Sequence, residues 1–139
     1  MCMKDELMQS LTDYTWEHNI GLDIGRFKPD FRSRAIPANN LIIINTSWKN
    51  RNEVPFSFAH EIGHIMNGDD GIRYYDSETI RDKSEFGANS FAIRYMLSFC
   101  EKHDLQFDNS MNFCQQFGIP EVLEYVAALE LRKKNLLEY

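Results

Sequence analysis

The chain has 139 residues, 43% of them hydrophobic and 13% aromatic. That composition is typical of a globular protein with a real core, so we expect one domain covering residues 1–139. The net charge of −6, with no basic cluster larger than residues 132–134, disfavours direct binding to nucleic acid. The first residues do not resemble a signal peptide, and no apolar run approaches the ~20 residues of a membrane span. We therefore expect a cytoplasmic protein that does not enter the membrane.

The N-terminal part of the chain predicts one helix followed by a small sheet. Residues 4–18 have the apolar spacing of an amphipathic helix, and residues 21–27 form a candidate strand. Two further strands, 33–36 and 41–46, flank the turn residues 37–40 and are predicted to pair as a hairpin. The second of them is rich in isoleucine, so we expect it to be buried.

The rest of the chain is predicted to be helical. The expected helices cover residues 53–67, 82–103, 108–117 and 120–137, with a loop at 68–81. Together with the N-terminal strands, this pattern predicts an α+β fold.

The helix predicted at 53–67 carries the sequence His60-Glu61-Ile62-Gly63-His64, an HExxH motif. Residues four apart lie on one face of an α-helix, so both imidazoles can bind the same zinc ion. Glu61 projects from the flank of that face, where a carboxylate can take a proton from a zinc-bound water without being a ligand. The alternative is an amphipathic helix with two incidental histidines.

The surroundings of the motif are consistent with a helix. Asn52 is a candidate N-cap, Pro55 is tolerated in the first turn, and Gly68 is a natural stop. Gly63 costs about 1 kcal/mol in a helix interior, which suggests that another element approaches closely there. Four apolar residues recur at helical spacing and are expected to face the core: Phe58, Ile62, Ile65 and Met66.

A zinc site of this kind needs a third protein ligand. The downstream candidates are Asp69, Asp70, Asp76, Glu78, Asp82, Glu85, Cys100, Glu101 and His103. Glu85 shares a helical face with Ala88, Asn89 and Ala92, and the small residues would let this helix lie against the zinc helix. Asn89 could support the site by hydrogen bonding to a ligand or to the zinc helix. The alternative role for Glu85 is in a capping box with Asp82 as N-cap. With the HExxH motif upstream, we favour the ligand.

The residues 58–64 (FAHEIGH), the pattern Glu85-x-x-Ala88-Asn89-x-Phe91-Ala92 and the strand 41–45 resemble the ImmA/IrrE-type metallopeptidases over roughly residues 20–100. The resemblance implies a zincin-like fold, with a small N-terminal sheet, an HExxH helix and a helical C-terminal part. It also implies His60, His64 and Glu85 as zinc ligands and Glu61 as the base. Family members often carry a C-terminal extension or a helix-turn-helix domain, for which this chain is too short, so we expect the catalytic module alone.

The resemblance implies a zinc-dependent intracellular endopeptidase of phage or mobile-element type that cleaves a regulatory protein, such as a helix-turn-helix repressor. The alternative is a non-hydrolytic, metal-containing binding module, an antirepressor or a toxin-like partner protein. The intact Glu61 favours the enzyme, because a structural site needs no base. We expect the strand 41–46 or its hairpin partner to offer an edge to an extended substrate segment.

The sequence also contains cysteines, a histidine and possible hydrogen-bond donors outside these motifs. Cys2, Cys100 and Cys114 are an odd, scattered set that fits a reducing compartment, and the last two are expected to be buried thiols. His18 is expected to pack or face solvent. Four residues are possible oxyanion donors, although each is more often a surface or packing residue: Arg73, Tyr74, Tyr75 and His103.

Overall fold

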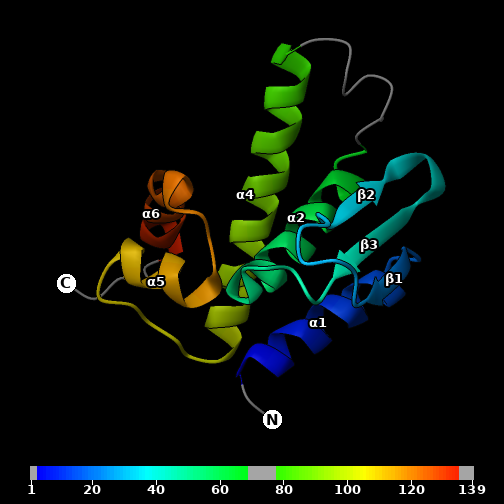
Figure 1. Ribbon diagram of the computed structural model, residues 1–139. Coiled ribbons are helices and arrows are strands. Elements are labelled where there is room, and N and C mark those ends of the chain that lie inside the picture. Colours follow the sequence, from blue (N-terminus) through cyan, green and yellow to red (C-terminus); the bar gives the residue numbers. More distant parts are fainter. Residues whose placement is uncertain (1–2, 69–77, 135–139) are drawn as a thin grey trace.

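A computed structural model of the chain describes residues 3–68 and 78–134 (Figure 1). Its N-terminal part is the helix α1 (Met3–Glu17) followed by the strands β1 (Gly21–Gly25), β2 (Arg34–Ile36) and β3 (Leu41–Asn45). The strand order is β1-β3-β2, with β3 parallel to β1 and antiparallel to β2. The predicted helix and hairpin are therefore confirmed. The isoleucine-rich strand β3 lies in the middle of the sheet, and its Ile42 and Ile44 are fully buried.

The remaining described helices are α2 (Val54–Met66), α4 (Glu78–Lys102), α5 (Ser110–Phe117) and α6 (Glu124–Lys134). In the part of the chain that the structure describes, short 3-10 turns precede or join these elements: η1 (Pro37–Asn39), η2 (Arg51–Glu53) and η3 (Glu121–Leu123). This is an α+β architecture with a three-stranded sheet and, within the described residues, five α-helices. It is consistent with a small zincin-like domain.

Two helix boundaries differ from the sequence prediction. α4 begins at Glu78, four residues before the predicted start, because residues 78–81 contain no glycine or proline and the acidic Glu78 suits a helix N-terminus. The last helix is preceded by the 3-10 turn η3, and the part of its predicted range beyond residue 134 lies outside the described residues.

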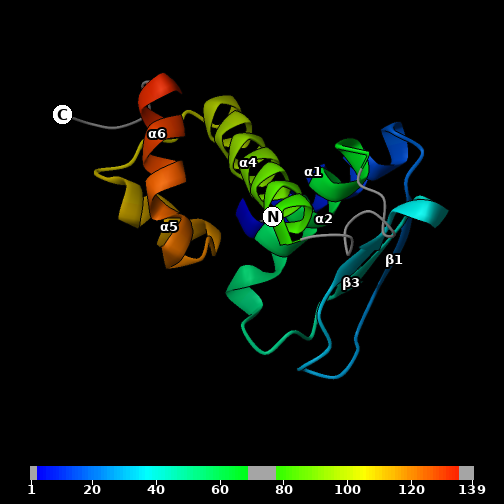
Figure 2. The same cartoon turned by 90° about the horizontal axis from the view of Figure 1, so that it is seen from above.

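The helices α2 and α4 lie between the sheet on one side and α5 and α6 on the other (Figures 1 and 2). Phe58 and Ile62 of α2 and Ile93 and Met96 of α4 are fully buried in one core. The prediction that Phe58 and Ile62 face the core is thus confirmed. Met66 is 41% exposed, so its assignment to the core is wrong; it stands in the last turn of α2.

The sequence predicted three residues at the ends of α2, and the structure confirms two of them. Pro55 lies in the first turn, and Gly68 follows the helix with a φ of +69°. The predicted N-cap Asn52 is wrong, because Arg51–Glu53 form a 3-10 turn that leads directly into the helix. The Asn52 amide instead donates to the carbonyl of Gln115 at 3.2 Å.

The described cysteines are buried free thiols, as predicted: Cys100 on α4 and Cys114 on α5. Burial raises the pKa of Cys100 to about 12 and that of Cys114 to about 11, with smaller contributions from the nearby Glu101 and Glu124 carboxylates. Cys2 lies outside the described residues. None of the described helices combines the length and apolar character that a membrane crossing requires.

Candidate metal centre

The helix α2 brings the two histidines of the motif together. His60 and His64 are one turn apart, and their Nε2 atoms are 3.2 Å from each other. His64 is 7% exposed, and its Nδ1 lies 3.5 Å from the Ser84 hydroxyl of α4. Ser84 can therefore orient this ring, a contact that the sequence pattern did not reveal.

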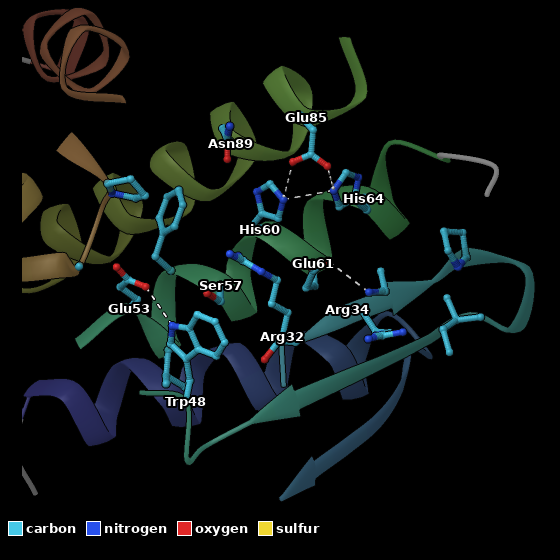
Figure 3. A pocket seen from close by; sticks show the side chains of 18 of the residues that line it. Arg32, Arg34, Trp48, Glu53, Ser57, His60, Glu61, His64, Glu85 and Asn89 are labelled. Atoms are coloured by element: carbon cyan, nitrogen blue, oxygen red, sulfur yellow. Dashed lines mark hydrogen bonds and ion pairs between the residues drawn. The ribbon is translucent and has the colours of Figure 1, made fainter. Parts of the chain in front are cut away.

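Glu85 completes the cluster from the neighbouring helix α4. Its Oε2 atom lies 3.0 Å from His60 Nε2, and its Oε1 atom lies 3.1 Å from His64 Nε2. Candidate ligand atoms of these three residues all lie within 4.8 Å of one another. Two imidazoles and one carboxylate that converge in this way form a donor set typical of catalytic zinc. Figure 3 shows the three side chains pointing toward one another.

The close approach of α2 and α4 explains Gly63. A Cβ atom at Gly63 would lie only 3.0 Å from the Cα and carbonyl oxygen of Ala88 and 3.1 Å from Phe91 Cβ. The predicted close contact at this glycine is confirmed. The capping-box alternative for Glu85 is wrong, because α4 begins at Glu78 and Asp82 lies inside the helix.

Glu61 lies beside the cluster but is not part of it. Its side chain is 8% exposed, and Oε1 accepts a hydrogen bond from the backbone N–H of Ala35 in β2 at 3.1 Å. Burial raises the pKa of the Glu61 carboxyl. This pKa is lowered by the nearby His60 and His64 and by the hydrogen bond from the Ala35 N–H, and it is raised further by the Glu85 carboxylate. The sheet therefore holds the candidate base in position next to the two histidines.

The cluster opens into a cleft of about 1000 Å³. One wall comes from β2 and the residues before it, and the other from α2 and α4. Gly118 and Pro120, between α5 and α6, also line the cleft. Asn89 lines it as well, and its supporting role stays a prediction.

The sequence did not point to several polar or aromatic residues of the cleft, among them Arg32, Trp48, Glu53 and Ser57 (Figure 3). Arg32 and Trp48 come from loops on either side of the hairpin, and no local pattern places them near residue 60. Helical spacing could have pointed to the other two. Ser57 precedes His60 by about one turn, and Glu53 precedes Ser57 by about one turn.

The other candidate residues lie elsewhere or outside the described range. His103 pairs with Glu6, Nδ1 to Oε2 at 3.6 Å, and its ring lies 4.3 Å from that of Phe99. His18 stacks on Tyr14 at 3.9 Å, as expected of a packing residue. Six candidates fall outside the described residues: Asp69, Asp70, Arg73, Tyr74, Tyr75 and Asp76.

The sheet order corrects one expectation about the substrate edge. The strand 41–46 cannot offer an edge, because β3 is paired on both sides. The hairpin partner β2 has a neighbour on one side only within the described residues, and its Ala35 N–H points to Glu61. The edge of the sheet formed by β2 therefore borders the cleft.

A comparison with protein families gives an independent result. Residues 15–112 match the peptidase M78 family model, described as the IrrE N-terminal-like domain. The matched span runs from the end of α1 to the start of α5 and includes His60, Glu61, His64 and Glu85. No curated protein and no solved structure matches the chain significantly.

Proposed function

The chain belongs to the ImmA/IrrE family of metallopeptidases, and from this membership we propose that it is a zinc-dependent endopeptidase that cleaves a regulatory protein inside the cell. The observation that supports this most strongly is the convergence of His60, His64 and Glu85 beside the buried Glu61. The donor set of two imidazoles and one carboxylate suits zinc, and a separate carboxylate is available as a base.

In this proposal His60, His64 and Glu85 hold the metal. When bound, zinc supplies a Lewis acid that makes water a nucleophile near neutral pH and polarises the scissile carbonyl. Glu61 accepts the proton of the attacking water and delivers it to the leaving amine nitrogen. The Ala35 N–H keeps Glu61 oriented toward the histidines, and the Ser84 hydroxyl orients His64.

The cleft favours an extended substrate segment. The edge of β2 borders the cleft, so a peptide can add to the sheet as a further strand and pass the cluster. A folded protein cannot present its backbone in this way. We therefore propose that the substrate is an exposed linker or terminus of a regulatory protein, such as a helix-turn-helix repressor of a phage or mobile element.

The test is cleavage of two substrates by purified enzyme with zinc: casein and the repressor encoded beside the gene. A single cut in the repressor, with slow or absent casein digestion, is the expected result. Rapid general digestion of casein would contradict the regulatory role.

Glu61→Gln is the matched variant for the mechanism. We expect it to keep its fold and its zinc but to lose about 10²–10⁴ in rate, because an amide cannot accept the water proton. Equal activity of this variant would contradict the mechanism. Absence of any zinc-dependent cut, with the repressor bound intact, would favour the non-hydrolytic binding module.

A further inference from the structure

The lining of the cleft includes the arginine Arg32. The Arg32 guanidinium carbon lies 5.2 Å from the centre of the Trp48 ring, and both residues line the cleft. Figure 3 shows the Arg32 side chain in the pocket between Trp48 and Glu61. Among residues 3–68 and 78–134, the guanidinium N–H groups of Arg32 have no carboxylate partner.

The indole beneath this arginine is held firmly. Trp48 is 9% exposed, and its Nε1–H donates to Glu53 Oε1 at 3.0 Å. Lys49 also approaches the ring, with Nζ 5.2 Å from its centre, but Lys49 does not line the cleft. An arginine that contacts a fixed aromatic face loses conformational freedom, and the N–H groups at the edge of its planar guanidinium stay exposed.

The charges around the cleft favour an acidic ligand. Two arginines and three glutamates line it: Arg32, Arg34, Glu53, Glu61 and Glu85. A divalent cation at the cluster would make the net charge of this lining positive, on a chain whose net charge is −6. A positive cleft on an acidic protein attracts negatively charged segments and repels basic ones.

We propose that Arg32 forms a subsite for an aspartate or glutamate side chain of the substrate, close to the scissile bond. This subsite rests on the proposed peptidase function. Arginine binds carboxylates through two parallel N–H···O bonds, a geometry that a neutral side chain does not match. Ala35, whose N–H reaches Glu61, follows Arg32 by three positions, or about 10 Å of extended chain. The acidic side chain therefore lies one to three residues from the scissile bond.

The experiment uses the full zinc-loaded chain with Glu61→Gln, so that bound peptides stay intact. A random decapeptide library is selected for binding, and the bound peptides are sequenced by mass spectrometry. One selected peptide is then compared with its counterpart in which the acidic residue is replaced by Asn or Gln, using fluorescence anisotropy. The affinities of the same two peptides are then measured for three double variants, in which Glu61→Gln is combined with Arg32→Gln, Arg32→Glu or Lys49→Gln.

We expect the acidic peptide to bind about tenfold or more tightly than its amide counterpart. Arg32→Gln should bring this ratio close to one, and Arg32→Glu should prefer a peptide with Lys at the same position. Lys49→Gln removes the same charge beside the same indole, outside the cleft, and should keep the ratio. Circular dichroism of each variant reports its folding. A library without acidic enrichment, or a ratio that Arg32→Gln leaves unchanged, would overturn the proposal.

Hydrolysis of the selected peptides by the wild-type enzyme separates the two proposals. If acidic and amide peptides are cut equally well, the subsite is wrong and the peptidase function stands. If the peptides bind with the acidic preference but are not cut, the peptidase function is wrong and the subsite stands. A loss of kcat on both peptides in Arg32→Gln, with unchanged KM, would show that Arg32 acts on the reaction itself and would overturn the subsite.

Discussion

In the candidate metal centre, individual side chains are held by contacts from neighbouring elements. Glu61 is held by the Ala35 N–H of β2, and His64 has the Ser84 hydroxyl at its Nδ1 atom. Nδ1 of His60 is buried and has no hydrogen-bond partner in the described part of the chain. The two histidines are therefore oriented differently, and we expect only His64 to depend on a hydroxyl group.

Replacing Ser84 with alanine tests this dependence. We expect Ser84→Ala to fold normally and to bind zinc about 10- to 100-fold more weakly, because partners that orient a metal-binding histidine typically contribute this much to affinity. Ser90→Ala is the matched control, since Ser90 is a buried serine on the same helix, 5% exposed. Competition with a chelator measures both affinities. Equal weakening in the two variants would mean that Ser84 has no specific role.

At the scale of elements, the candidate metal centre depends on the packing of α2 against α4. The sequence predicted this arrangement well, because the HExxH spacing, Gly63 and the small residues around Glu85 are local patterns with a direct geometric meaning. The glycine contact with Ala88 and the position of Glu85 follow from those patterns. The central position of β3 could not be predicted, because strand order depends on contacts between distant segments.

The same limit explains the missed residues of the cleft. Arg32 and Trp48 lie in irregular segments, and only the packing of both segments beside α2 brings them together. Helical periodicity carries no information about such loops. The N-cap prediction at Asn52 was wrong because the 3-10 turn Arg51–Glu53 leads directly into the helix, and the Asn52 amide donates to Gln115 on the distant helix α5.

Gly63→Ala tests the helix contact. An added Cβ would meet backbone atoms of Ala88 at 3.0 Å, so the helices must separate. We expect a loss of about 1–3 kcal/mol in the free energy of unfolding, despite the better helix propensity of alanine, together with weaker zinc binding. Chemical denaturation and chelator competition measure the two effects.

Gly87→Ala is the control on the facing helix. Its Cβ would meet only the Asn67 side-chain amide, at 2.9 Å, and that amide can move. We expect Gly87→Ala to be neutral or stabilising by up to about 1 kcal/mol. If Gly63→Ala is equally harmless, the close approach of the two helices does not constrain this position.

At the scale of the whole molecule, the C-terminal helices share the core and also complete the cleft. Gly118 has a φ of +66°, and a Cβ there would lie 1.9 Å from the carbonyl oxygen of Asn52. This contact, together with the Asn52–Gln115 hydrogen bond, fixes the C-terminal part against the start of α2. Part of the cleft lining therefore comes from residues far from the motif in sequence.

The buried thiols report on the integrity of this shared core. Because burial raises the pKa of Cys100 to about 12 and of Cys114 to about 11, both thiols stay protonated in the folded protein at pH 8. The unfolded thiols ionise near pH 8.5. The two buried protonated thiols therefore contribute fully to the free energy of unfolding below about pH 8.5. This contribution is lost as the pH rises toward the pKa values of the folded thiols.

We expect iodoacetamide at pH 8 to leave Cys100 and Cys114 unmodified in the folded protein and to modify both in denaturant, because only the thiolate reacts. Peptide mapping by mass spectrometry measures each site separately, with the denatured sample as the control. Rapid modification of either residue in the folded protein would contradict its position in the core.

The most direct test of the metallopeptidase assignment is the zinc content of the purified chain and its variants, measured by native mass spectrometry. Wild type should contain about one zinc ion per chain, and His60→Ala, His64→Ala and Glu85→Gln should each lose it. Glu53→Gln is the matched control, since Glu53 is a cleft glutamate outside the cluster, and it should keep its zinc. Full zinc retention by Glu85→Gln would contradict the account, because a third ligand other than Glu85 would then be required.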